Sequence, residues 1–133
     1  MSYRIWLFFA GVLGVLALAA GSYGAHALGG SNTYSAAIKA FEAGVLYHAL
    51  HALALLGLAG LMAATEGRRS SFASAAMHGA GVAFTLGAVL FAGGIYGRVT
   101  GLAPDFAGVA PVGGVMLMAG WLALAASALG LRR

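Results

Sequence analysis

Four long uncharged stretches dominate the pattern of hydrophobic and polar positions along the chain. They cover residues 5–27, 44–64, 71–97 and 112–131. Each is at least 20 residues long, and a helix of that length reaches about 30 Å, the thickness of the hydrocarbon core of a bilayer. The pattern therefore predicts an all-α integral membrane four-helix bundle, formed by a single transmembrane domain over residues 1–133.

The first stretch has a second interpretation, as a secretory signal peptide. Arg4 precedes the apolar run, and Ala25-His26-Ala27 has the small-residue form of a cleavage site. The run is 23 residues long, whereas the apolar region of a signal peptide typically spans about 7–15 residues. We therefore expect a membrane helix here.

A short amphipathic segment, Tyr34 to Val45, leads into the second stretch. Ile38 and Phe41 fall on one side of a helix built from it, and Lys39 and Glu42 fall on the other. The segment is expected to lie at the membrane interface. The alternative is that it forms the outer turns of the second membrane helix.

Composition supports a membrane protein. Hydrophobic residues make up 62% of the chain and charged residues 8%, against about 45–50% and about 25% in soluble domains. So few charges could not cover the surface of a soluble fold. The chain has no cysteine, which excludes disulfides, thiolate nucleophiles and sulfur ligands for metals.

The positive charges indicate which way the chain crosses the membrane. The net charge is +4, but the basic residues lie at the ends of the apolar runs rather than in a cluster, which argues against nucleic acid as a partner. Five of the seven lie on the side of both termini: Arg4, Arg68, Arg69, Arg132 and Arg133. The positive-inside rule then places both termini in the cytoplasm, with the chain in a bacterial inner membrane.

Small residues are expected to hold the helices together. The chain has 22 glycines, and in lipid, helices associate where small side chains let their backbones come close. The candidate positions are Gly93 with Gly97, Gly11 with Gly14, Gly21 with Gly24, and Gly57 with Gly60. These pairs favour a compact bundle, and they also suit contact with other membrane proteins.

Three histidines form the candidate functional site, at the outer ends of the first and second stretches. They are His26, His48 and His51. The last two are three residues apart, so they share a helix face. Tyr23, Tyr47 and Tyr96 are expected at a similar depth, whereas His78 lies near the opposite membrane surface.

We consider three roles for this cluster. The first is structural, with histidines and tyrosines forming hydrogen bonds between helices or an aromatic belt. In the second, His26 with His48 or His51 would bind a transition metal or a haem iron. In the third, the histidines would relay protons or a small solute. The first role requires no cofactor and is the one we expect.

No sequence motif indicates an enzyme. The chain has no phosphate-binding loop, no nucleophile elbow and no zinc-binding HExxH. Its only carboxylates are Glu42, Glu66 and Asp105, and they do not share one side of the membrane. A mechanism that uses paired carboxylates is therefore not expected.

Several sequence blocks in this order resemble a known family. The blocks are GSYGAHAL at 21–28, YHALHALALL at 47–56, LFAGGIYG at 90–97, APVGG at 110–114 and GW at 120–121. They are similar to the domain-of-unknown-function 423 family of small membrane proteins, which includes transmembrane protein 256-like proteins. The resemblance spans residues 4–131 and implies four membrane helices but no activity. The family pattern contains His26 and His51, and often has serine where this chain has Gly93 and Gly94.

We therefore expect a small polytopic membrane protein without enzymatic activity. Its function would be that of an accessory or structural protein, packing against itself or a larger membrane complex. The alternatives are a helical bundle that binds a ligand, metal or haem through the histidines, and a small channel or transporter. The last is weakened because the membrane stretches contain no carboxylate or arginine.

Overall fold

The computed structural model describes residues 2–28 and 36–131 and is built from four long helices. These are α1 (Arg4–Tyr23, continued by the π-helical turn η1, Gly24–Leu28), α2 (Ala36–Ala64), α3 (Ser71–Thr100) and α4 (Ala110–Ser127, continued by the 3-10 turn η3, Ala128–Gly130). A 3-10 helix, η2 (Pro104–Val109), precedes α4. All four long helices have the length and apolarity needed to cross a membrane, which confirms the predicted fold class.

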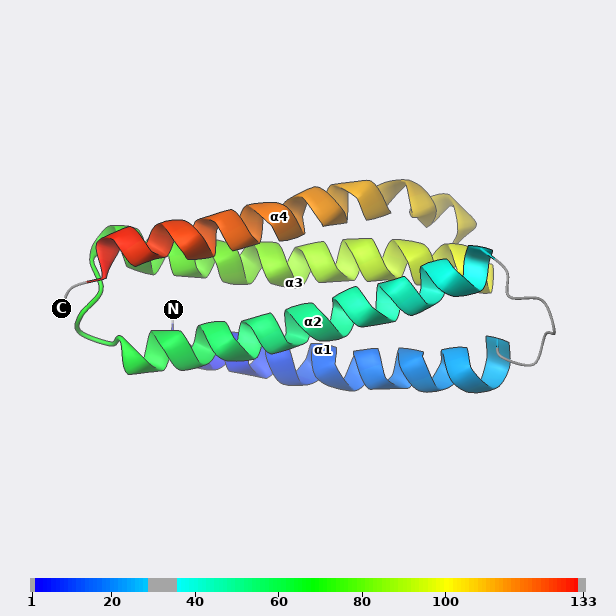
Figure 1. The fold of residues 1–133 in the computed structure, drawn as a ribbon, viewed down its shortest axis with the longest axis horizontal. Coiled ribbons are helices and arrows are strands. Elements are labelled where there is room, and N and C mark those ends of the chain that lie inside the picture. The colour runs from blue at the N-terminus through cyan, green and yellow to red at the C-terminus, as the bar shows by residue number, and fades with distance from the viewer. Residues whose placement is uncertain (1, 29–35, 132–133) are drawn as a thin grey trace.

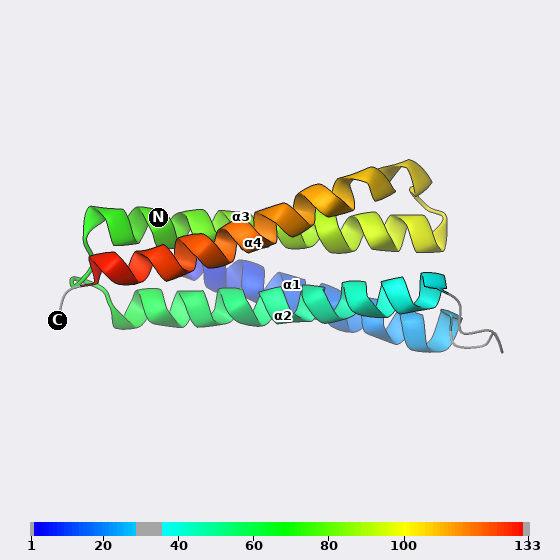
Figure 2. The same ribbon diagram turned by 45° about the horizontal axis from the view of Figure 1, so that its top comes forward.

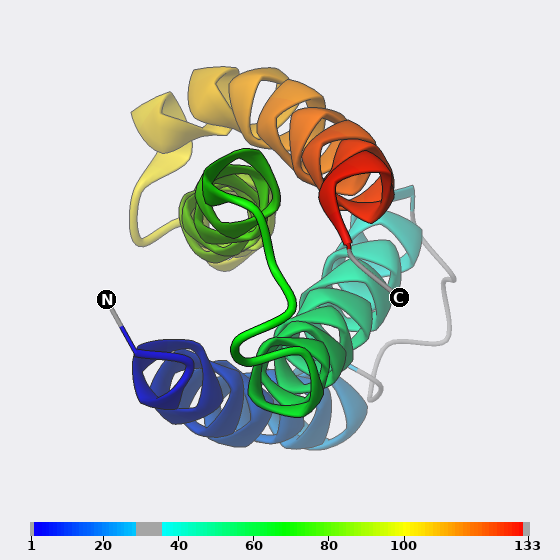
Figure 3. The same ribbon diagram turned by 90° about the vertical axis from the view of Figure 1, so that its left-hand side faces the viewer.

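The helices run up and down along one common axis (Figures 1 and 2). Both ends of the chain lie at the same end of the bundle, together with the turn between α2 and α3 (Figure 1). We call this the terminal end. Viewed along the axis, α1 and α2 form one pair, and α3 and α4 form the other (Figure 3). Each hairpin buries one side against the other hairpin and leaves its remaining surface for lipid.

The amphipathic segment expected before the second span is the first part of α2, from Ala36 onward. The two residues before Ala36 lie outside the described part of the chain. Phe41 is buried, whereas Lys39 and Glu42 are exposed, so the predicted amphipathic pattern holds within a continuous helix. A helix of 29 residues is about 43 Å long, which exceeds the bilayer core and lets these first turns reach the headgroup region.

Side chains and glycines set the ends of α3. The hydroxyl of Ser70 accepts a hydrogen bond from the backbone N–H of Ala73 at 3.1 Å, and so caps the first turn. At the other end Gly101 has φ +74°, a left-handed conformation that glycine adopts without steric cost. The chain then folds back through η2 into α4.

Glycines bring α3 and α4 into close contact. A Cβ at Gly120 would lie 2.7 Å from the ring of Phe84, and one at Gly113 would meet the backbone nitrogen of Phe91. Phe84 is fully buried in this contact. Because a side chain has no room at these positions, glycine sets the close approach of the two helices.

The glycine pairs that the sequence singles out fall into two groups. In the first group a Cβ would lie close to atoms of other residues of the chain. Its members and their neighbours are Gly21 with Val45, Gly24 with the ring of Phe41, Gly97 with the backbone of Ala103, and, at 4.0 Å, Gly93 with the ring of Phe106. A Cβ at Gly11, Gly14, Gly57 or Gly60 would meet nothing within 4 Å. The second group takes no part in packing the described bundle, so only part of this prediction describes contacts within the chain.

Candidate functional site

His51 is buried in the bundle and holds two hydrogen bonds that fix its tautomer. Its Nδ1 lies 2.7 Å from the carbonyl oxygen of Tyr47, one turn earlier in α2. A carbonyl only accepts, so Nδ1 carries the hydrogen and donates it. The Nε2 lone pair is then free to accept the indole N–H of Trp121, which comes from α4 at 3.1 Å. Both ring nitrogens of His51 are thus engaged within the protein.

His48 is equally buried, with 5% of its surface exposed, but it contacts a different helix. Its Nδ1 lies 3.3 Å from the hydroxyl of Tyr96 on α3. Its Nε2 is the one buried side-chain nitrogen or oxygen in the described residues for which no hydrogen-bond partner is found. The shared helix face predicted for His48 and His51 therefore points into the bundle, but their nitrogens point to separate partners.

The other predicted residues lie apart from this pair. His26 is exposed in the turn η1 after α1. Tyr23 and Tyr47 are roughly half exposed, and their rings contact Phe41 and Phe91 respectively. Within the described residues, no group of three or more histidine, cysteine or acidic side chains is placed to hold a metal ion. Of the three predicted tyrosines, Tyr96 is the one whose hydroxyl lies within hydrogen-bonding distance of a histidine, His48.

A second tryptophan–histidine pair, which sequence reasoning missed, lies nearer the terminal end. The indole N–H of Trp6 on α1 donates to Nδ1 of His78 on α3 at 3.0 Å. Trp6 is buried, and its ring lies directly over Gly81 of α3. The available signal was that the sequence has two tryptophans, each with an N–H that needs a partner when it is buried.

Together the two pairs join helices that are not consecutive in the chain. Trp6–His78 ties α1 to α3, and Trp121–His51 ties α4 to α2. Each bond therefore connects the α1–α2 hairpin to the α3–α4 hairpin. Interhelical hydrogen bonds of this kind stabilise membrane bundles. In this structure His51 and His78 act as hydrogen-bond acceptors that connect the two hairpins.

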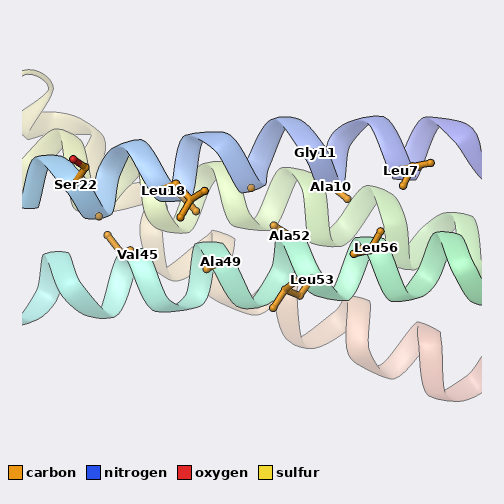
Figure 4. A pocket seen from close by; sticks show the side chains of 13 residues that line it. Leu7, Ala10, Gly11, Leu18, Ser22, Val45, Ala49, Ala52, Leu53 and Leu56 are labelled. Atoms are coloured by element: carbon orange, nitrogen blue, oxygen red, sulfur yellow. The ribbon is translucent and has the colours of Figure 1, made fainter.

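An apolar groove runs between α1 and α2 on the outside of the bundle (Figure 4). Its volume is about 580 Å³. Small residues form much of its wall: Ala10, Gly11, Gly14, Ala17 and Gly21 from α1, and Ala49 and Ala52 from α2. On α1 it extends from Leu7 to Ser22, about 22 Å at 1.5 Å per residue. The groove therefore crosses most of the bilayer core.

Comparisons with known proteins give the chain relatives along its whole length. The UPF0382 inner membrane protein YgdD of Escherichia coli strain K12 is 37% identical over 134 residues, which cover 100% of this chain and 95% of the relative. The protein of the same name from Shigella flexneri gives the same figures. No solved structure matches the chain.

The family described as "Protein of unknown function (DUF423)" matches residues 20–114, which include the end of α1, all of α2 and α3, and the beginning of α4. Its relatives are inner membrane proteins by name, and the four apolar helices agree with that location. The chain belongs to the DUF423 family of small inner membrane proteins, whose function is not known.

Proposed function

We propose that this protein has no enzymatic activity and acts as an accessory or structural membrane protein, docking another transmembrane helix in its α1–α2 groove. That helix belongs to a second copy or to a larger membrane complex. The observation that carries the proposal is the groove of about 580 Å³, which no side chain of the described bundle fills. Gly11 and Gly14 line it, and a Cβ at either would meet nothing within 4 Å.

The dimensions of the groove favour a helix over a lipid chain. Lipid chains from one leaflet reach about half of the 30 Å hydrocarbon core, whereas the groove extends for about 22 Å along α1 between Leu7 and Ser22. A transmembrane helix runs the full distance. Small residues along the groove would let its backbone come close, which is the main source of helix association in lipid.

Cysteine crosslinking in native membranes tests this proposal, because the chain contains no cysteine of its own. We expect Gly14→Cys to form a disulfide-linked or bifunctionally crosslinked product with a neighbouring chain. Val115→Cys is the matched control, since Val115 is 60% exposed on α4 and does not line the groove. No product from Gly14→Cys, or equal yields from the two variants, would contradict the proposal.

Ligand binding by the histidines is the second candidate function, supported by the unpartnered Nε2 of His48. A metal or haem bound there would coordinate this nitrogen, with no role for His51 unless Trp121 moves away. Metal analysis and an absorption spectrum of gently purified protein test it. A stoichiometric metal or haem band that is lost in His48→Ala would support the candidate, and a colourless, metal-free sample would remove it.

A further inference from the structure

A second hollow lies on α1, beside the α1–α2 groove. Its volume is about 500 Å³, and residues of α1 alone line it: Leu7, Phe8, Gly11, Val12, Val15 and Leu16. The groove shares Leu7 and Gly11 with this hollow, so the two lie side by side along α1. One helix docked in the groove would leave the second hollow unfilled.

The contact area also favours a partner that presents two helices. A helix about 10 Å wide, sunk to half its circumference along about 22 Å of the groove, would bury about 350 Å² on each side. The total of about 700 Å² is below the roughly 1,000 Å² that a specific interface requires. A second helix seated in the hollow would add about half of this area again and bring the total to about 1,000 Å².

We infer that the partner is a second copy of this chain, related to the first by a twofold axis along the membrane normal. The inference rests on the docking role proposed for the groove. The second copy places its α1 in the groove and its α2 in the adjacent hollow. By symmetry, α1 of the first copy then occupies the groove of the second, so one interface fills both hollows on both molecules.

The sidedness of the protein sets the depth at which the two copies meet. Copies inserted under the same positive-inside rule share one orientation, so identical residues of a twofold pair lie at the same depth. Gly11 and Gly14, which have no atom within 4 Å of a Cβ, then lie opposite their own counterparts, where two backbones can come close. Residues 5–27 carry no charge, so no like charges meet where the two α1 helices cross.

Val15 and Leu53 are the side chains that this arrangement brings together between copies. Val15 lines the second hollow and is 68% exposed, and Leu53 of α2 lines the groove and is 66% exposed. Gly21 lies against Val45. Val15 is six residues from Gly21 and Leu53 is eight residues from Val45, in the same direction along the bundle. The two side chains therefore lie within about 3 Å of the same depth.

Crosslinking between two differently tagged copies, expressed together in native membranes, tests the inference. One copy carries Val15→Cys and the other carries Leu53→Cys, and a short bifunctional thiol reagent is added. We expect a product of twice the mass of the chain that contains both tags. Both residues are exposed, so neither substitution disturbs the core.

Val115→Cys is the matched control in place of Val15→Cys, because Val115 is also exposed but lies on α4, in the other hairpin. It should give no product with Leu53→Cys above the background of random collisions. No product from Val15→Cys with Leu53→Cys, or an equal yield from the control pair, would overturn the inference.

The Gly14→Cys variant separates this inference from the docking role on which it rests. If the Val15→Cys and Leu53→Cys pair gives no product but Gly14→Cys is crosslinked to a different protein, the second copy is wrong as the partner and the docking role stands. If Gly14→Cys gives no product either, both are contradicted. A Gly14→Cys product of twice the mass of the chain, together with the two-tag product, would support both.

Discussion

His51 and His78 each accept a hydrogen bond from a tryptophan of the other hairpin. For His51 this pairing has a chemical consequence, because its Nε2 lone pair already accepts the N–H of Trp121. A metal ion could use that nitrogen only by displacing the indole, which would leave a buried N–H without a partner. At the residue scale, the histidine therefore acts as a connection between helices.

Removing the indole N–H should destabilise the bundle. Trp121→Phe keeps an aromatic ring but leaves Nε2 of His51 without its donor, which costs about 1–3 kcal/mol of folding free energy. Thermal unfolding in detergent micelles should therefore show a lower Tm. Tyr47→Phe is the control, because His51 bonds to the backbone carbonyl of Tyr47, which phenylalanine retains. Equal Tm values for Trp121→Phe and Tyr47→Phe would contradict the assigned bond.

The sequence predicted the positions of the histidines better than their partners. His48 and His51 lie buried on one face of α2, as their spacing indicates. Their partners come from α3 and α4, 48 and 70 residues away, and depend on how the helices are rotated. Nothing in the local pattern around His51 identifies Trp121 as its donor, and the sequence alone does not distinguish Trp121 from His26 as its neighbour.

At the scale of the helices, the inward side of α3 is defined by its glycines. All sides of a membrane helix are apolar, so the hydrophobic pattern does not tell the core side from the lipid side. Gly79 and Gly81 illustrate the difference. A Cβ at Gly81 would lie 2.5 Å from the ring of Trp6, whereas a Cβ at Gly79 would meet nothing within 4 Å. Spacing alone could not separate them.

These two glycines give a matched pair of substitutions. Gly81→Ala should lower the stability of the bundle by about 1–3 kcal/mol, because the new methyl group forces Trp6 out of its position. Gly79→Ala should leave stability unchanged or raise it slightly, since alanine is the better helix former. Unfolding in detergent, followed by helical circular dichroism, checks both. A loss of stability in Gly79→Ala equal to that in Gly81→Ala would contradict the packing described for Trp6.

At the scale of the whole molecule, the sequence predicted the four spans and the bundle, because span length and apolarity are read directly from the chain. The groove could not be predicted, since it depends on the spacing and rotation of α1 and α2, which leave space beside Gly11 and Gly14. The two hairpins also differ in how their glycines are used. Glycines inside the α3–α4 contact meet side chains, whereas these two glycines of α1 face outward.

The most direct test of the proposed docking role is the mass of the protein after mild detergent extraction, measured for the natural chain and for Gly14→Leu. A leucine at this position fills the groove but meets no atom of the bundle within 4 Å of its Cβ. We predict that the natural chain is extracted with a second copy or another membrane protein, and that Gly14→Leu is extracted as a folded monomer. A natural chain that is already monomeric, or a Gly14→Leu chain that keeps its companion, would contradict the account.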